Sequence, residues 1–369
     1  MYDVKISDYL RQKAARSKLP LISAFELSPV CNFSCKMCYV RKTQSEVNQC
    51  GGLLPADWWI DLAKEGYEAG LLYPLLTGGE PFLYPGIEKV VTELGRMGMF
   101  VTMNTNASLI TERELEWLLE HPPLRLNITL YGASDESYGK LCGDYNGFTK
   151  VKKAVDLLLK NGIGIRFNSS IVPENQHELK DIIDYGKSVE HAVKVATYMF
   201  PPIRRMEECF GQNERLTAHD CGKNKVLADY YQLSEESFER VAKYYSGFTP
   251  LSEIDFDKLN IGEGSQMRCM AGRASYWVDW QGNLSACGMM DDPKISLKDT
   301  PFKKAWEEIA EHTEAVRCKA ICEACPNNPY CHTCITMVHS ETGNLNGRPK
   351  YFCEMMEAAS TAYKSMLSK

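Results

Sequence analysis

The sequence predicts an α/β fold, a partial TIM barrel of about six strand–helix units, followed by a cysteine-rich C-terminal domain. From about residue 21 to residue 200, short apolar segments alternate with segments of helical periodicity. The apolar segments are nearly continuous, which is typical of parallel strands that are covered by helices. A complete barrel has eight such units, so a doubly wound open sheet is the competing topology.

Local signals place the individual elements. Strands are expected at 22–28, 71–76, 100–104, 125–131, 163–171 and 193–199. Between them, residues 150–160 carry the apolar stripe of an amphipathic helix. Thr111 and Glu114 have the spacing of a capping box at the start of another helix, and Pro55 and Gly70 delimit a third. The order of these signals is the order that a parallel sheet with outer helices requires.

The chain divides into three regions by composition. Residues 1–200 are expected to form the barrel, residues 201–260 a polar linker or lid, and residues 261–369 a cysteine-rich domain. The linker region turns helical at about 234–246. In the last region, the turn residues 281–283 predict a β-hairpin.

Charge and cysteine content exclude several classes of protein. The net charge is −6 without a long basic run, whereas nucleic-acid binders usually carry a basic stripe, so no nucleic-acid partner is expected. No segment approaches the ~20 apolar residues of a membrane span, and a cytoplasmic protein without membrane association is expected. Cytosolic thiols stay reduced. The fifteen cysteines therefore indicate metal ligands or catalytic groups rather than disulfides.

Three of these cysteines directly follow the first expected strand. Cys31, Cys35 and Cys38 offer three thiolates at tight spacing. A cubane cluster is closed by four thiolates, so three ligands leave one iron open to bind a substrate. A structural zinc site is the alternative, and it normally has four ligands in two separated pairs.

This C-x3-C-x2-C signature resembles the radical SAM superfamily. In that family the open iron is chelated by S-adenosylmethionine, and an electron from the [4Fe-4S] cluster cleaves it to methionine and a 5′-deoxyadenosyl radical. The family often has an aromatic residue just before the third cysteine, where this chain has Met37. The resemblance also places Tyr39, directly after Cys38, among the residues that bind the cofactor.

A second motif follows the second expected strand. Gly78, Gly79, Glu80 and Pro81 resemble the segment that binds the methionine amino group in the family. Consecutive glycines let the backbone approach a ligand closely, although a plain strand–helix turn has the same residues.

Later strands contribute further residues that the resemblance assigns to cofactor binding. Thr129 and Lys140 have about the separation of the hydroxyl and the cation that hold the ribose and the methionine carboxylate. Asn104 and Ser169 are similar candidates on neighbouring strands. Each could instead be a solvated or capping residue.

The C-terminal cysteines resemble the SPASM extension of radical SAM enzymes, which carries two auxiliary [4Fe-4S] clusters. The resemblance assigns Cys322, Cys325, Cys331 and Cys353 to the distal cluster, and Cys269, Cys287 and Cys334 to the nearer one. Only two residues separate Cys331 and Cys334, where the family typically has three. The nearer cluster lacks an obvious fourth thiolate. Either Cys318 supplies it, or the site stays open for a substrate thiol.

The resemblance implies an oxidoreductase that modifies a peptide by a thioether crosslink, a carbon–carbon crosslink or dehydrogenation, as in RiPP maturation. A peptide epimerase is an alternative, with Cys209 or Cys221 in the expected lid as hydrogen donor. A sulfatase maturase is another, although Gly288 stands after Cys287 where those enzymes have an Asp. An iron–sulfur electron-transfer protein is the non-enzyme alternative. The expected partners are a peptide, a separate leader-binding protein, and an electron donor such as flavodoxin or ferredoxin.

Overall fold

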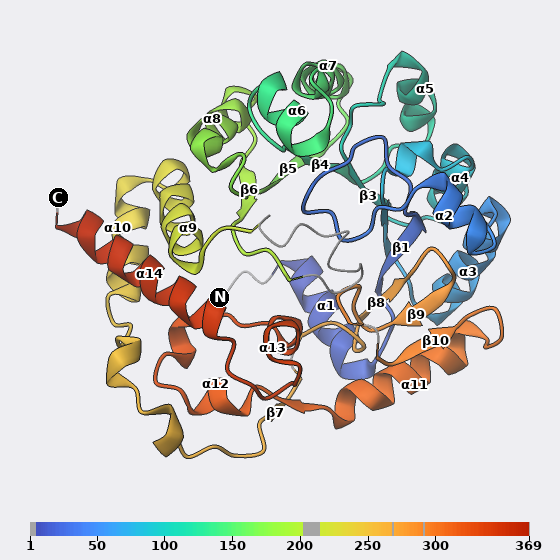
Figure 1. Ribbon diagram of the computed structural model, residues 1–369. Helices are drawn as coiled ribbons and strands as arrows, with labels where there is room; N and C mark the ends of the chain where they lie inside the picture. Colours follow the sequence, from blue (N-terminus) through green and yellow to red (C-terminus); the bar gives the residue numbers. More distant parts are fainter. Residues whose placement is uncertain (1–4, 202–214, 268, 291, 369) are drawn as a thin grey trace.

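Six parallel strands form the centre of the molecule and confirm the predicted partial barrel (Figure 1). The computed structural model describes residues 5–201, 215–267, 269–290 and 292–368. The strands are β1 (Ile22–Ser28), β2 (Tyr73–Gly78), β3 (Thr102–Thr105), β4 (Arg125–Thr129), β5 (Ile165–Ser170) and β6 (Val193–Ala196). Each pairs in parallel with the next. All six overlap the segments predicted from the sequence.

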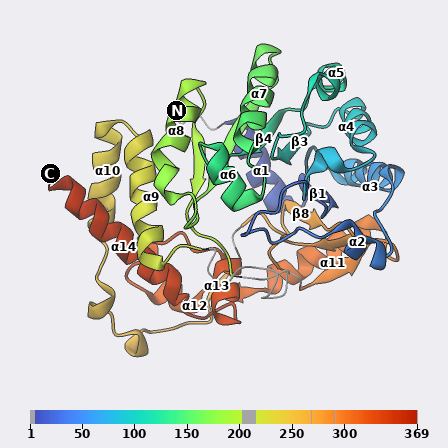
Figure 2. The same cartoon turned by 45° about the horizontal axis from the view of Figure 1, so that its top comes forward.

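Helices cover the outer side of this sheet, as Figures 1 and 2 show. They are α2 (Gln44–Gln49), α3 (Ala56–Ala69), α4 (Ile87–Arg96), α5 (Glu112–Glu120), α6 (Asp135–Cys142), α7 (Gly147–Lys160) and α8 (Leu179–Ser188). Aromatic pairs fix the outward face of the strands. The Phe25 ring of β1 lies 5.5 Å from that of Trp59 in α3, and the Phe167 ring of β5 lies 5.7 Å from that of Tyr185 in α8.

The predicted hairpin extends the barrel sheet. Strand β8 (Ser275–Val278) pairs in parallel with β1 and antiparallel with β9 (Asn283–Ser285), which is followed by β10 (Lys294–Ser296). The carboxylate of Asp279 holds the turn, since it accepts the backbone N–H groups of Gln281 and Asn283 at 2.9 and 3.0 Å. The sheet therefore has nine strands in the order β10-β9-β8-β1-β2-β3-β4-β5-β6.

A helix that precedes β1 lies at the start of the strands. Helix α1 (Ile6–Ser17) buries Ala14 and Ala15 against Leu21 and Ala274. In Figure 1 it is seen inside the arc of β1–β6. Its placement closes the amino end of the barrel, opposite the loops that carry the first cysteines.

Three helices pack beyond β6, namely α9 (Ala218–Gln232), α10 (Glu235–Tyr245) and α14 (Lys350–Leu367). The helix expected at 234–246 is confirmed as α10. Helix α9 lies in the region expected as linker or lid and was not predicted. It packs against α8 and α14, so its apolar residues do not form a single stripe.

The remaining C-terminal elements are short apart from α11. They are β7 (Ser265–Gln266), α11 (Phe302–Ala315), β11 (Arg317–Cys318), α12 (Ala320–Ala324) and α13 (Ile335–Thr342). Strands β7 and β11 form a separate antiparallel pair. Among the described helices, none has the length and apolar character needed to cross a membrane.

Candidate functional site

The loop after β1 carries Cys31, Cys35 and Cys38, all partly buried. Two sulfurs accept backbone hydrogen bonds within the loop. The N–H of Phe33 donates to Cys31 Sγ and the N–H of Arg41 to Cys38 Sγ, each at 3.3 Å. Hydrogen bonds to sulfur favour the thiolate form that binds iron.

The loop lies directly against the end of β2. The N–H of Gly79 donates to the Ser28 carbonyl at 2.7 Å, and the N–H of Glu80 donates to the Val30 carbonyl at 2.9 Å. A Cβ atom on Gly79 would lie 2.2 Å from the Val30 carbonyl oxygen, and one on Gly78 would lie 2.2 Å from that of Ser28. Only glycine fits this approach, so the two glycines hold the cysteine loop against the sheet.

Glu80 is fully buried at the same place. Its carboxylate accepts bonds from the Thr105 hydroxyl at 2.7 Å, the Asn106 N–H at 2.8 Å and the Phe82 N–H at 3.1 Å. Burial raises the pKa of Glu80 to about 7, while these hydrogen bonds act in the opposite direction. Glu80 thus joins the turn after β2 to the end of β3.

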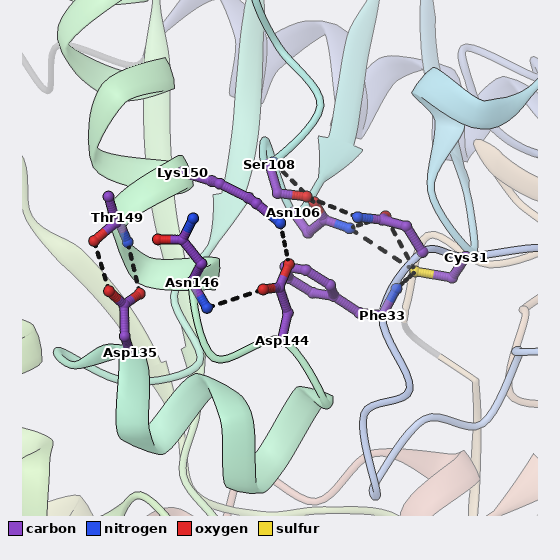
Figure 3. Close-up of polar contacts among 10 residues, drawn as sticks. Cys31, Phe33, Asn106, Ser108, Asp135, Asp144, Asn146, Thr149 and Lys150 are labelled. Atoms are coloured by element: carbon purple, nitrogen blue, oxygen red, sulfur yellow. Dashed lines mark hydrogen bonds and ion pairs between the residues drawn. The ribbon is translucent and has the colours of Figure 1, made fainter.

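Residues after β3 reach the cysteine loop (Figure 3). The side-chain amide of Asn106 donates to Asn32 Oδ1 at 2.9 Å and lies 3.8 Å from Cys31 Sγ. Its own oxygen accepts from Ser108, at 2.9 Å from the backbone N–H and 2.7 Å from the hydroxyl. The sequence predicts a cofactor-binding role for Asn104, two residues earlier, and not for Asn106. Asn104 lies instead on the inner face of the barrel, bonded to Asn127.

Two of the residues predicted to bind the cofactor make other contacts in this structure. Lys140 is exposed on α6 and forms an i,i+4 ion pair with Glu136 at 2.6 Å. Ser169 is buried on the outer side of β5, where its hydroxyl donates to the Leu130 carbonyl at 2.8 Å. By contrast, Thr129 is partly exposed at the end of β4, and Tyr39 is partly buried beside Cys38.

Three residues near the loop were not expected from the sequence. The thiol of Cys142, at the end of α6, and the hydroxyl of Tyr131 are in hydrogen-bond contact with Cys35. Arg41 is the cation beside the loop, and its Nε is buried without a hydrogen-bond partner among the described residues. Only its position directly after the cysteines could have indicated Arg41.

The eight C-terminal cysteines come together as two sets of four. One set is Cys269, Cys287, Cys318 and Cys334, since the other three thiols lie close enough to Cys269 to raise its pKa. The other is Cys322, Cys325, Cys331 and Cys353. Burial and the neighbouring thiolates raise the pKa of Cys322 to about 11 and that of Cys331 to about 12. The second set also lines one small cavity.

From the sequence, Cys318 is one of two possibilities for the fourth ligand of the nearer auxiliary cluster. The pairing of β11 with β7 buries it, with its Sγ 3.7 Å from the Ser265 carbonyl oxygen. In the described parts of the chain, no three Cys, His, Asp or Glu side chains converge closely enough to hold a single metal ion. A four-iron cluster binds each thiolate to a different iron and needs wider spacing, so two sets of four separate thiols fit that donor pattern.

Of the two cysteines expected as hydrogen donors, the structure describes one. Cys209 lies outside the described residues. Cys221 is fully buried in α9, where its thiol is in hydrogen-bond contact with Thr197 and Tyr351, and burial raises its pKa. The expectation of an accessible hydrogen donor at Cys221 is therefore wrong for this structure, because α9 packs tightly against its neighbours.

The fold and the cysteine loop define a cluster-binding α/β barrel, and the comparisons give its family. The family profile of the radical SAM superfamily matches residues 25–186, from β1 into α8. A probable GTP 3′,8-cyclase from Sulfurisphaera tokodaii is 30% identical over 277 residues, which are 74% of this chain and 82% of that protein. The chain belongs to the radical SAM superfamily.

Two other relatives align over more of the chain at lower identity. An AdoMet-dependent heme synthase from Methanosarcina barkeri is 22% identical over 89% of this chain and 95% of that protein. The subtilosin biosynthesis protein AlbA from Bacillus subtilis is 26% identical over 86% of this chain and 67% of that protein.

Solved structures share the fold. Native anSMEcpe with bound AdoMet aligns with a TM-score of 0.67 at 16% identity, over 95% of this chain and 98% of that one. Streptococcus suis SuiB bound to the precursor peptide SuiA aligns with a TM-score of 0.65 at 16% identity, over 94% and 79%. The chain is thus a radical SAM enzyme whose fold extends through the C-terminal cysteines.

Proposed function

We propose that this enzyme oxidatively modifies a peptide, with the C-terminal cysteines holding two auxiliary [4Fe-4S] clusters. The observation that carries the proposal is the grouping of eight cysteines into two sets of four. Full thiolate ligation suits electron transfer, whereas the three-cysteine loop leaves an iron open. The names of AlbA and of SuiB with its precursor peptide support a peptide substrate.

The residues of the first loop would hold the catalytic cluster. Cys31, Cys35 and Cys38 are its ligands, and the bound cluster and S-adenosylmethionine together supply a one-electron cleavage that removes a hydrogen atom from the substrate. The N–H groups of Phe33 and Arg41 stabilise the ligand sulfurs. The Arg41 guanidinium lies at the loop as a cation for the methionine carboxylate.

The C-terminal sets would complete the oxidation. An auxiliary cluster held by these thiols would supply an acceptor for the second substrate electron and would return that electron to the first cluster, while the proton that leaves the substrate passes to solvent or a base. The net change is loss of two hydrogens from the peptide, balanced by reduction of S-adenosylmethionine to 5′-deoxyadenosine and methionine. The proposed external donor, a flavodoxin or ferredoxin, provides the first electron.

A second candidate is oxidation of a small carboxylated molecule. The heme synthase relative aligns over nearly its whole length, and the barrel has a cationic inner face, which is described below. Epimerisation is less well supported because Cys221 is buried. A sulfatase-maturase activity is less well supported because Gly288 packs against Trp277 where an acid would be needed.

The test is an anaerobic incubation in deuterated water of reconstituted enzyme with reductant, S-adenosylmethionine and the short peptide encoded beside its gene. The peptide is then examined by tandem mass spectrometry. We expect 5′-deoxyadenosine and a peptide lighter by two hydrogens that map to specific residues. If the peptide takes up one deuterium and does not lose two hydrogens, the reaction is epimerisation and the proposal is replaced. Deoxyadenosine with an unchanged peptide would reject the peptide substrate.

A further inference from the structure

The inner face of the barrel is polar and partly exposed. On β3, β5 and β6, side chains alternate between a buried outer set and a more accessible inner set, and on β4 the inner residues Arg125 and Thr129 are the more accessible ones. The register aligns the inner positions across strands, so Asn104 lies beside Asn127, and Asn127 beside Arg166. Phe167, the next residue on β5, packs outward on α8. Arg166 therefore faces inward.

A chain of hydrogen bonds crosses this face and orients an arginine. Asn104 donates to the Thr77 hydroxyl at 3.4 Å, and Asn127 donates to Asn104 Oδ1 at 2.9 Å. Arg125 Nε then donates to Asn127 Oδ1 at 3.1 Å. Because Nε is used in this bond, the guanidinium is held in one orientation and its two terminal nitrogens remain available.

Three guanidinium groups approach one another here. They belong to Arg125 of β4, Arg166 of β5 and Arg11 of α1. Burial is the main cause that lowers the pKa of Arg125, and the nearby charges of Arg166 and Arg11 lower it further. Arg125 and Arg166 form no ion pair among the described residues, and Asp8 is the acid recorded with Arg11, at 3.9 Å and on the exposed side. Two half-buried cations side by side, with no acid paired to them among the described residues, favour the binding of an anionic group.

Two further charged side chains of the described strands lie on the inner face. Glu26 of β1 is fully buried and accepts the indole N–H of Trp277 at 3.1 Å. Lys194 of β6 is a further cation on the inner face, aligned in register with Asn168. The inner face from β4 to β6 thus has three positive side chains with amides between them.

We propose that Arg125 and Arg166 bind a carboxylate group of the substrate inside the barrel. The inference rests on the proposed function, since it specifies what the modified substrate presents to the enzyme. A planar guanidinium pairs with a carboxylate through two parallel hydrogen bonds, and the Asn127 bond orients Arg125 for this contact. The carboxylate can belong to an acidic peptide or to a small carboxylic acid.

The test measures binding of defined probes to the cluster-loaded enzyme by anaerobic calorimetry, without reductant. The probes are triglutamate, triglutamine as the neutral control, and citrate. We expect triglutamate to bind more tightly than triglutamine, and Arg125→Gln and Arg166→Gln each to weaken it at least about tenfold. Arg166→Lys should keep part of the affinity. Arg113→Gln, an exposed arginine on α5, should leave it unchanged.

The outcomes separate this inference from the proposed function. If citrate binds and needs both arginines, while triglutamate does not bind, the carboxylate site is supported and its ligand is a small acid. This result would reject the peptide substrate. The site is overturned if Arg113→Gln weakens triglutamate binding as much as Arg125→Gln and Arg166→Gln do. It is also overturned if triglutamate and triglutamine bind equally well. Deoxyadenosine formation without substrate is measured on every variant, and its retention shows that an altered affinity does not come from misfolding.

Discussion

The two cysteine regions use the same ligand in different ways. In the first, three thiols lie on one loop, and backbone hydrogen bonds from Gly79 and Glu80 fix that loop to the sheet. In the second, eight thiols come from β11, α12, α14 and the loops between 269 and 334. The first arrangement is set by local sequence, whereas the second exists only once distant segments have packed.

The largest expected effect concerns the first region. Cys35→Ala should abolish 5′-deoxyadenosine formation, by at least ~1000-fold, because the iron that binds S-adenosylmethionine is lost with its cluster. Iron content should fall by about four atoms per chain, with the remaining clusters still visible by electron paramagnetic resonance. The control is Cys50→Ala, since Cys50 is exposed and belongs to neither cysteine region. Normal deoxyadenosine formation by Cys35→Ala would show that this loop is not the catalytic centre.

A smaller effect is expected in the second region. Cys318→Ala removes the thiol that completes the first set of four, so we expect loss or conversion of one auxiliary cluster. Substrate oxidation should fall at least tenfold while deoxyadenosine formation continues, because cleavage of S-adenosylmethionine depends on the other region. Iron analysis, spectra and product yield are compared with Cys50→Ala. If the iron content and the spectra of Cys318→Ala are unchanged, the fourth ligand of this auxiliary cluster is not Cys318.

This contrast also explains what could be predicted from the sequence. The three-cysteine loop and the glycine pair were found because their chemistry depends on short spacings. The role of Cys318 stayed open because its neighbours depend on the β7–β11 pairing, which joins residues far apart in the chain. Even so, the strand positions and the hairpin followed from apolar runs and turn residues alone.

The positions of Lys140 and Ser169, and the unexpected helix α9, have physical causes. Lys140 has Glu136 one helical turn away, and this local ion pair keeps it at the surface. Ser169 shares a face of β5 with Phe167, and strand alternation places that face under the helices. Helix α9 was missed because it is covered on more than one side. Alternation along β5 indicates the outward position of Ser169, whereas the local signal for α9 is only its N-cap, where the Thr217 hydroxyl accepts the Asp220 N–H.

The smallest expected effect tests how the first region is held. Burial raises the pKa of Glu80 from its ordinary value of 4.5 to about 7, so the folded state binds this proton more tightly than the unfolded state. The stabilisation that results is fully present below pH 4.5 and is lost as the pH rises through 7. Its upper limit is about 3 kcal/mol.

Glu80→Gln keeps the shape of the side chain and removes the titration. We therefore expect wild type to lose stability relative to Glu80→Gln between pH 5 and pH 8, with most of the change below pH 7 and little above it. The measurement is the melting temperature of both proteins under anaerobic conditions across this range, and the difference between them cancels the titration of all other groups. A constant difference at every pH would mean that Glu80 keeps an ordinary pKa, and that its three hydrogen bonds offset the cost of burying the carboxylate.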